Sequence, residues 1–107
     1  MSEALVVITT VERLEDGERL ARRLVEERLA ACVQILPPMT SIYRWEGQVE
    51  RAAEHLLLIK TTREAYEPLA AALRAQHPYQ TPELIALPVT AGSPDYLAWL
   101  FDSVRPR

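Results

Sequence analysis

Two long stretches of strand-like sequence flank one tight-turn dipeptide, Glu46-Gly47, and this feature constrains the fold most. Residues 31–46 and 48–62 are the predicted arms of a single hairpin, because glycine readily takes the positive φ that a two-residue turn requires. Each arm exceeds the usual strand of about 3–10 residues. At about 3.4 Å per residue an unbent arm would reach about 50 Å, more than a compact domain of this size can cover. The far end of the hairpin is therefore expected to project.

The arms contain two features that limit how the hairpin can be completed. Pro37-Pro38 cannot donate ladder hydrogen bonds and predicts an edge, bulge or bend, while a bulge is also expected at residues 52–54. The projecting part carries Ile42, Tyr43 and Trp45, which are costly to leave in water. Edge-to-edge pairing with other copies would cover them, so the sequence predicts a closed cyclic homo-oligomer. The alternative is a hairpin tip that folds back onto its own domain.

Apolar periodicity predicts the remaining elements. We expect strands at 4–10 and 83–90, a helix at 16–30 capped by Asp16, a helix to about Gln76 after a capping box at 61–64, and a terminal helix from Pro94. The resulting β-α-β-β-α-β order, followed by a C-terminal helix, predicts an α+β, ferredoxin-like sandwich. Both long helices should cover one face of an antiparallel sheet in a single domain, residues 1–107.

Composition excludes several classes of function. The net charge of −3 argues against nonspecific nucleic-acid binding, and no apolar run approaches the roughly 20 residues that span a bilayer. Residues 1–4 lack the basic flank of a signal peptide, which predicts a cytoplasmic protein. One cysteine and two histidines equip a single chain poorly for a closed zinc site. No nucleophile elbow, phosphate-binding glycine loop or paired acid and base is visible, so an enzyme is the least favoured class.

A few single residues are candidates for chemistry. Lys60 is the sole lysine in a chain that otherwise uses arginine, which suggests a compact ammonium that pairs with a carboxylate or holds an anionic ligand, although chance retention explains it equally well. His77 ends a predicted helix, where a cationic imidazole is favoured; it either caps the helix or contacts a metal or anion. Cys32 reads as a small buried apolar residue, with a metal or redox role as the alternative.

The aromatic and acidic candidates have an ordinary interpretation as well as a functional one. Tyr43, Trp45 and Tyr79 are typical of core or interface anchors. Glu83 could supply an oxygen ligand to a hard cation, while solvated surface is the default for such a side chain.

Five segments together resemble the CutA divalent-cation tolerance family: AACV (30–33), SIYRWEG (41–47), LIKTT (58–62), HPYQTPE (77–83) and YLAWL (96–100). The resemblance implies a cytoplasmic, ferredoxin-like homotrimer whose long hairpins pair between subunits, with a link to copper and other divalent cations. It also implies a trimer similar to PII-type signalling proteins, which bind ligands in clefts between subunits. Members that hold copper use a cysteine where Thr9 stands here, and two histidines where this chain has Gln76-His77.

Two hypotheses for function follow. The first is a non-enzymatic, trimeric metal-response protein that binds divalent cations such as copper weakly, through His77 with Glu83 or other carboxylates. The second is a PII-like regulatory module that binds a small anionic molecule in an intersubunit cleft. That cleft would be lined by Lys60, Tyr43, Trp45, Tyr79 and Glu83. A structural scaffold for another protein is a third, less specific hypothesis.

Overall fold

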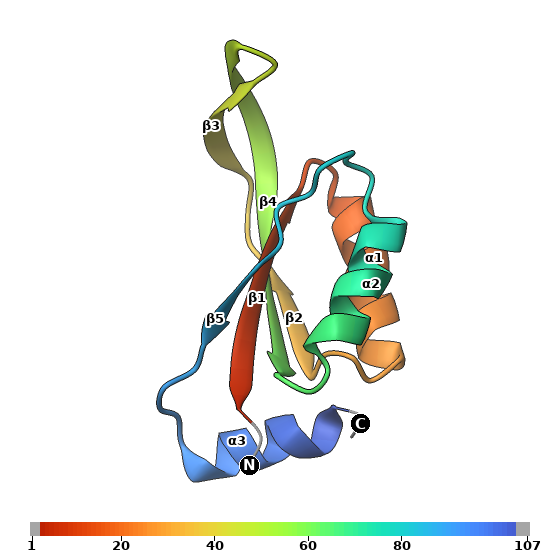
Figure 1. Cartoon of the computed structure of the whole chain (residues 1–107). Coiled ribbons are helices and arrows are strands. Elements are labelled where there is room, and N and C mark those ends of the chain that lie inside the picture. Colours follow the sequence, from red (N-terminus) through yellow and green to blue (C-terminus); the bar gives the residue numbers. More distant parts are fainter. Residues whose placement is uncertain (1–2, 105–107) are drawn as a thin grey trace.

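The computed structural model describes residues 3–104 (Figure 1). A cytoplasmic location was predicted from residues 1–4, and two of these, Met1 and Ser2, lie outside the described residues. The elements in chain order are β1 Ala4–Val11, α1 Leu14–Glu26, β2 Cys32–Ile35, β3 Met39–Trp45, β4 Gln48–Thr62, α2 Tyr66–Gln76, β5 Ile85–Pro88 and α3 Pro94–Ser103. This order confirms the predicted α+β class.

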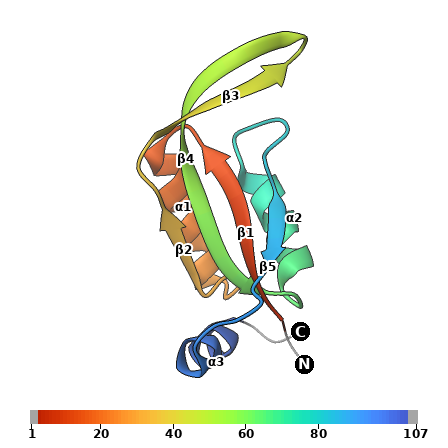
Figure 2. The same cartoon turned by 90° about the vertical axis from the view of Figure 1, so that its left-hand side faces the viewer.

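The strands form an antiparallel sheet in the order β2-β4-β1-β5, and β3 pairs with the far half of β4. α1 and α2 cover one face of this sheet (Figure 2). Alternate residues of β1 and β4, such as Val7, Leu57 and Ile59, point toward the two helices and are fully buried. They pack against a helical layer that consists of Leu20, Leu24, Leu69 and Leu73. Burying such side chains contributes about 1.5–3 kcal/mol each, which makes this interface the main core.

The hairpin of β3 and β4 projects from the body, as predicted. β1 pairs with β4 only as far as His55, so that residues 48–54 of β4 pair with β3 alone. The molecule measures 44 Å along its long axis against 26 and 23 Å across it. Glu46 and Gly47 form the turn with φ of 50° and 80°, which is the conformation predicted for this dipeptide. The hairpin bends toward the side of the loop that follows α2 (Figure 2), and Trp45, next to the turn, lines a cavity with Gln80 and Thr81 of that loop.

A bulge at Pro37-Pro38 separates the hairpin from the body. The amide of Leu36 donates to the carbonyl of Leu56 at 2.9 Å, and the next paired residue on this strand is Met39, opposite Glu54. Both prolines therefore stand opposite His55 alone. The bulge predicted at residues 52–54 was wrong, because β4 runs without interruption through them.

Three predicted boundaries were also wrong. Asp16 does not cap α1, which begins at Leu14; it lies in the first turn and pairs with Arg19 at 2.9 Å. Residues 61–64 are not a capping box, because α2 begins only at Tyr66 and its N-cap residue has no side-chain cap. The last strand covers Ile85–Pro88 and is shorter than predicted.

Within residues 3–104, no helix has both the length and the apolar character needed to cross a bilayer.

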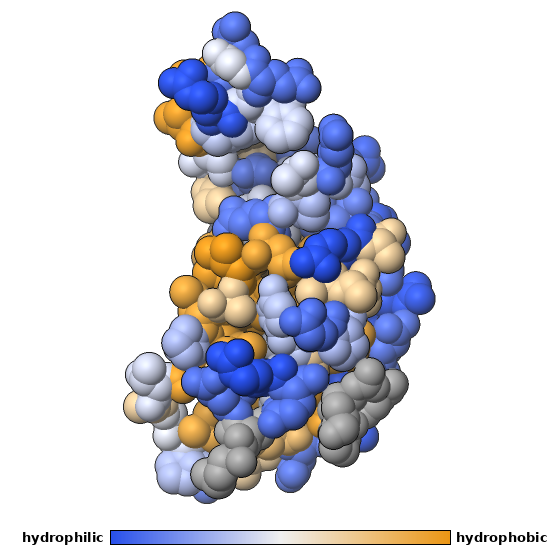
Figure 3. All heavy atoms as spheres, viewed as in Figure 1, coloured by the Kyte–Doolittle hydropathy of each residue, from blue (hydrophilic) through white to orange (hydrophobic). Residues whose placement is uncertain are grey.

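The second face of the sheet, here called the open face, is not covered by α1 or α2. Strand pairing places six apolar side chains on it: Val6, Ile8, Leu56, Leu58, Ile85 and Leu87. Ile85 and Leu87 are 49% and 47% exposed. The space-filling view shows a hydrophobic patch in this region, between the hairpin and α3 (Figure 3). α3 packs across the end of the sheet that is opposite the hairpin (Figure 1).

Candidate functional site

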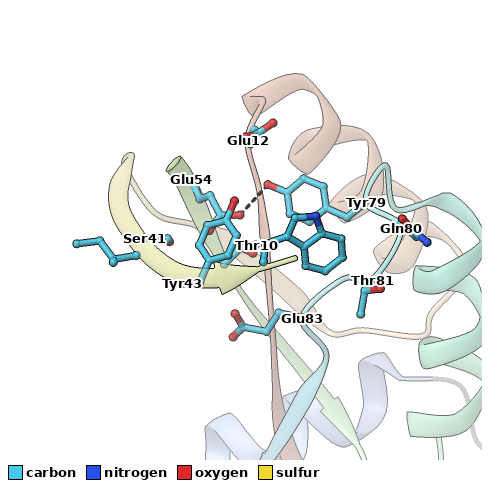
Figure 4. A pocket seen from close by; sticks show the side chains of 11 residues that line it. Thr10, Glu12, Ser41, Tyr43, Glu54, Tyr79, Gln80, Thr81 and Glu83 are labelled. Atoms are coloured by element: carbon cyan, nitrogen blue, oxygen red, sulfur yellow. Dashed lines mark hydrogen bonds between the residues drawn. The ribbon is translucent and has the colours of Figure 1, made fainter. Parts of the chain in front are cut away.

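A cavity of about 610 Å³ lies at the base of the hairpin. Its walls come from the end of β1, from both hairpin strands and from the loop that follows α2 (Figure 4). The lining residues are Thr10, Glu12, Ser41, Ile42, Tyr43, Trp45, Glu54, Tyr79, Gln80, Thr81 and Glu83. Four of the five predicted ligand-binding residues are in this set, and Lys60 is the exception.

The alternation of side chains along the hairpin explains why these residues meet. Side chains of a strand point to opposite faces in turn, and cross-strand partners share a face. Ser41, Tyr43 and Trp45 therefore lie on one face of β3, and Glu54 joins this face because Met39 is its partner. The loop after α2 brings Tyr79 and Glu83 against the same face (Figure 4).

Glu54 is the most buried acid of the cavity, with 8% of its surface exposed. Its Oε2 accepts a hydrogen bond from the hydroxyl of Tyr79 at 2.7 Å, and the hydroxyls of Ser41 and Thr10 also hydrogen-bond to this carboxylate. Burial alone would raise the pKa of Glu54, but the three hydrogen bonds outweigh it and hold the pKa below its ordinary value. Burial and the adjacent carboxylate raise the pKa of Tyr79. Glu54 is thus a charged anchor whose bonding capacity is largely taken by protein donors.

Glu83 has the opposite electrostatic character. Burial, together with repulsion from Glu54, raises the pKa of this carboxyl. No lysine, arginine or histidine side chain is among the lining residues. Arg44 and Arg51 belong to the same hairpin, but the alternation of side chains places them on its other face. The cavity is therefore acidic and has aromatic walls.

His77 lies next to this cavity and does not line it. It is 8% exposed; its Nε2 lies 2.8 Å from the carbonyl of Thr10, and its Nδ1 accepts a hydrogen bond from the amide of Tyr79 at 3.1 Å. The bond to a carbonyl requires that Nε2 carry the proton. Burial lowers the pKa of His77, although the bond to Thr10 and nearby carboxylates act in the opposite direction. The imidazole is accordingly neutral at pH 7, whereas the helix end alone had predicted a cation.

Lys60 lies on the open face, away from the cavity. Its Nζ donates to Oε1 of Gln34 at 2.8 Å and sits 5.9 Å from the ring centroid of Tyr96. Cys32 is on the same face, half-buried, with its Sγ 3.9 Å from the Tyr96 hydroxyl. The structure therefore divides the five predicted ligand-binding residues between two places.

Sequence reasoning missed Thr10, Glu12, Ser41 and Glu54 as site residues. Counting outward from the Glu46-Gly47 turn would have placed Ser41 and Glu54 on the face of Tyr43, because strand pairing fixes the register. No pattern in the sequence indicated that β1 ends beside this face, since that contact depends on tertiary packing.

The described residues were also searched for clusters of metal-binding side chains. Across residues 3–104 there is no group of three or more histidine, cysteine, aspartate or glutamate side chains arranged to hold a metal ion. His77 offers no free ring nitrogen in its present geometry, because both nitrogens are hydrogen-bonded.

The layers, the strand order and the long central hairpin define a ferredoxin-like α+β protein. Residues 5–103 match the model of the family described as CutA1 divalent ion tolerance protein, and the chain belongs to this family. The resemblance predicted from its sequence segments is thereby confirmed.

Individual relatives agree with this assignment. The divalent-cation tolerance protein CutA of Thermus thermophilus is 52% identical over 95 residues, which cover 89% of this chain and 92% of the relative. The chloroplastic protein CutA of Arabidopsis thaliana is 49% identical over 102 residues, 95% of this chain, and this match spans only 56% of the plant protein.

Solved structures show the same fold. The divalent cation tolerance protein Cut A1 of Thermus thermophilus superposes with a TM-score of 0.92 at 48% identity, covering 98% of this chain and all of the other. CutA1 of Oryza sativa superposes with a TM-score of 0.95 at 45% identity, covering 98% and 96%.

Proposed function

We propose that this chain is a cytoplasmic homotrimer that acts in tolerance to divalent cations, binds copper weakly and catalyses no reaction. Membership of a divalent ion tolerance family supports the general role. The trimer, the identity of the metal and the strength of binding go beyond that membership and are argued from this chain.

The open face supports an assembly of several copies. Its six apolar side chains and the exposed hairpin residues Ile42, Tyr43 and Trp45 leave an apolar surface that single soluble chains rarely expose. The hairpin also has an unpaired edge along β3, which pairs only with β4. Burying both in a closed ring of three would remove these two costs at once.

The metal proposal rests on two carboxylates, Glu12 and Glu83, which could each give oxygen ligands but are too few to complete a metal site. Glu12 and Glu83 border the cavity, and neither forms an ion pair with another residue between 3 and 104. Two carboxylates from one chain are too few for a tight metal site. At a boundary between subunits of a symmetric oligomer, carboxylates from neighbouring chains would come together. Among common divalent ions, Cu²⁺ forms the most stable complexes with oxygen and nitrogen ligands, which favours oxidised copper.

His77 remains a predicted metal ligand with a specific requirement. Its Nδ1 would have to release the amide of Tyr79 before it could bind a metal ion. This requirement weakens binding, because the half-buried amide of Tyr79 would lose its partner.

Calorimetric titration with Cu²⁺ tests the metal proposal. The wild-type protein should bind weakly and with fewer than one ion per chain, since each site is shared. Glu83→Gln should reduce the heat of binding, while Glu67→Gln, which makes the same change on the surface of α2, should not. Absence of heat with the wild type, or equal binding by the two variants, would refute the proposed site.

The alternative function is a PII-like module that binds a small anionic ligand between subunits. One observation favours it: Lys60 lies on the open face, where other copies would meet, close to Tyr96. A thermal-shift screen with phosphorylated and carboxylated metabolites tests it. A hit that is lost in Lys60→Met would support this alternative, and the same response in both proteins would reject it.

A further inference from the structure

We propose that the outward face of the hairpin binds an acidic, extended segment of another protein, one that carries two carboxylates at alternate positions. The outward face is defined here by three residues, Arg44, Val49 and Arg51. None of the three lines the cavity at the base of the hairpin. The proposal goes beyond the proposed function and uses neither the carboxylates of the metal proposal nor the open face on which copies are proposed to meet.

Strand alternation directs the outward face away from the open face. β4 is continuous over its 15 residues, so Val49 and Arg51 lie on the same side of it as Leu57, which points toward the helices and is fully buried. Arg44 shares this side because Val49 is its cross-strand partner. An assembly that buries the open face therefore leaves the outward face on its exterior.

The two arginines of this face have no acidic partner among the described residues. Neither Arg44 nor Arg51 forms an ion pair with another residue between 3 and 104. The residue opposite Arg51 is Ile42, and the residue opposite Arg44 is Val49, so both cross-strand neighbours are apolar. Glu50 precedes Arg51 in the chain but points to the other face. The arginines are themselves diagonal neighbours, about 7–8 Å apart, and their charges repel each other.

The spacing of these cations matches an extended acidic segment. A guanidinium presents parallel N–H donors that fit the two oxygens of a carboxylate. Carboxylates at alternate positions of an extended segment are about 6.6–6.8 Å apart, which is close to the spacing of the two arginines. Val49 is 66% exposed, and a segment that covers it would exclude water beside the two ion pairs and strengthen them.

Other partners fit this face less well. The chain has a net charge of −3, and two arginines would neutralise too few phosphates to hold a nucleic acid. Glu46 and Glu50 belong to the same hairpin and would repel a polyanion that extends beyond the two arginines. A purely apolar segment would take water from both cations without replacing it. A short acidic segment avoids each of these costs.

Fluorescence anisotropy with a labelled peptide tests the proposal on the full chain. The probe is an eight-residue peptide of alternating glutamate and serine, and the control peptide has glutamine in place of every glutamate. We expect saturable binding of the glutamate peptide that weakens as salt is added, and no binding of the glutamine peptide. Absence of saturable binding, or equal binding of the two peptides, overturns the proposal.

Variants of the protein locate the binding site. Arg44→Gln and Arg51→Gln should each raise the dissociation constant of the glutamate peptide about fivefold or more, because each removes one of two ion pairs. Arg74→Gln removes the same charge from the exposed surface of α2 and should leave the constant unchanged. If Arg51→Gln and Arg74→Gln behave alike, the proposal fails.

The mass of the assembly separates this inference from the proposed function. Light scattering should give the same mass for Arg51→Gln as for the wild type, because the outward face lies outside the surface on which copies are proposed to meet. A reduced mass for Arg51→Gln would show that the outward face is a contact between copies. That result would overturn the inference and leave the proposed trimer standing.

Discussion

The hydroxyl of Tyr79 donates a 2.7 Å hydrogen bond to the buried carboxylate of Glu54 and thereby joins the loop after α2 to the base of the hairpin. The same loop holds Glu83 at the cavity, and the same tyrosine donates its amide to His77. Tyr79 therefore connects the hairpin, the cavity and the buried histidine, through its hydroxyl on one side and its backbone amide on the other.

Tyr79→Phe should lower the free energy of unfolding by about 1–3 kcal/mol at pH 7, because a buried charged carboxylate loses one of its donors. Chemical denaturation measures this change. Tyr96→Phe removes an exposed hydroxyl whose neighbour is Cys32 Sγ at 3.9 Å, and it should change stability by less than about 0.5 kcal/mol. Similar losses in the two variants would show that the Tyr79–Glu54 bond does not stabilise the hairpin.

Glu83→Gln should raise the melting temperature at pH 7 to 8 and leave it nearly unchanged at pH 4. The pKa of Glu83 in the folded protein is above its ordinary value of 4.5, so the folded state prefers the protonated carboxyl. The stability linked to this group is present below pH 4.5 and is lost as pH rises through the raised pKa. Glutamine mimics the protonated form and escapes that loss. A variant that melts below the wild type at pH 8 would contradict the assigned electrostatics.

The imidazole of His77 should titrate below its ordinary pKa of 6.5 in proton NMR spectra. Burial disfavours the cation, and a proton on Nδ1 would oppose the amide of Tyr79. The unfolded chain then binds a proton more readily than the folded protein, so stability should fall as pH decreases below 6.5. A measured pKa at or above 6.5 would mean that His77 is more accessible than the structure shows.

Leu87→Glu should reduce the assembly from three chains to one, because it puts a charge on the apolar open face where subunits are proposed to meet. Light scattering after size-exclusion chromatography gives the mass, to be compared with 12.1 kDa for one chain. Val25→Glu is the matched control, because Val25 is 41% exposed and belongs to α1, a helix that covers the opposite face of the sheet (Figure 2). An intact trimer in Leu87→Glu would exclude the open face from the interface.

Much of the fold could be predicted from sequence because its signals are local. The Glu46-Gly47 turn and the length of the two arms predicted the projecting hairpin, and apolar periodicity predicted a helix after the first strand. The exact start of α1 could not be predicted, because Asp16 acts inside the first turn through Arg19 instead of before it. Pro37-Pro38 predicted an edge, bulge or bend, and the bulge does lie there, whereas the second bulge expected at residues 52–54 is wrong because pairing with β3 continues through them.

The candidate site was predictable only in part, for a related reason. Tyr43, Trp45, Tyr79 and Glu83 stood out as residue types and do share a cavity. Lys60 stood out because it is the only lysine of the chain. That rarity does not indicate that β4 directs its side chain toward Gln34 and Tyr96, away from the cavity. The state of His77 was predicted from the helix end, but burial against Thr10 decides it, and burial is a tertiary property.

The central claim is that divalent cations bind between copies of this chain and not within one. A copper anomalous difference map from a crystal grown with Cu²⁺ tests this claim most directly. We expect threefold assemblies with copper peaks at subunit boundaries, contacted by carboxylates from more than one chain. A copper ion held entirely by one chain, or a packing without such assemblies, would contradict it.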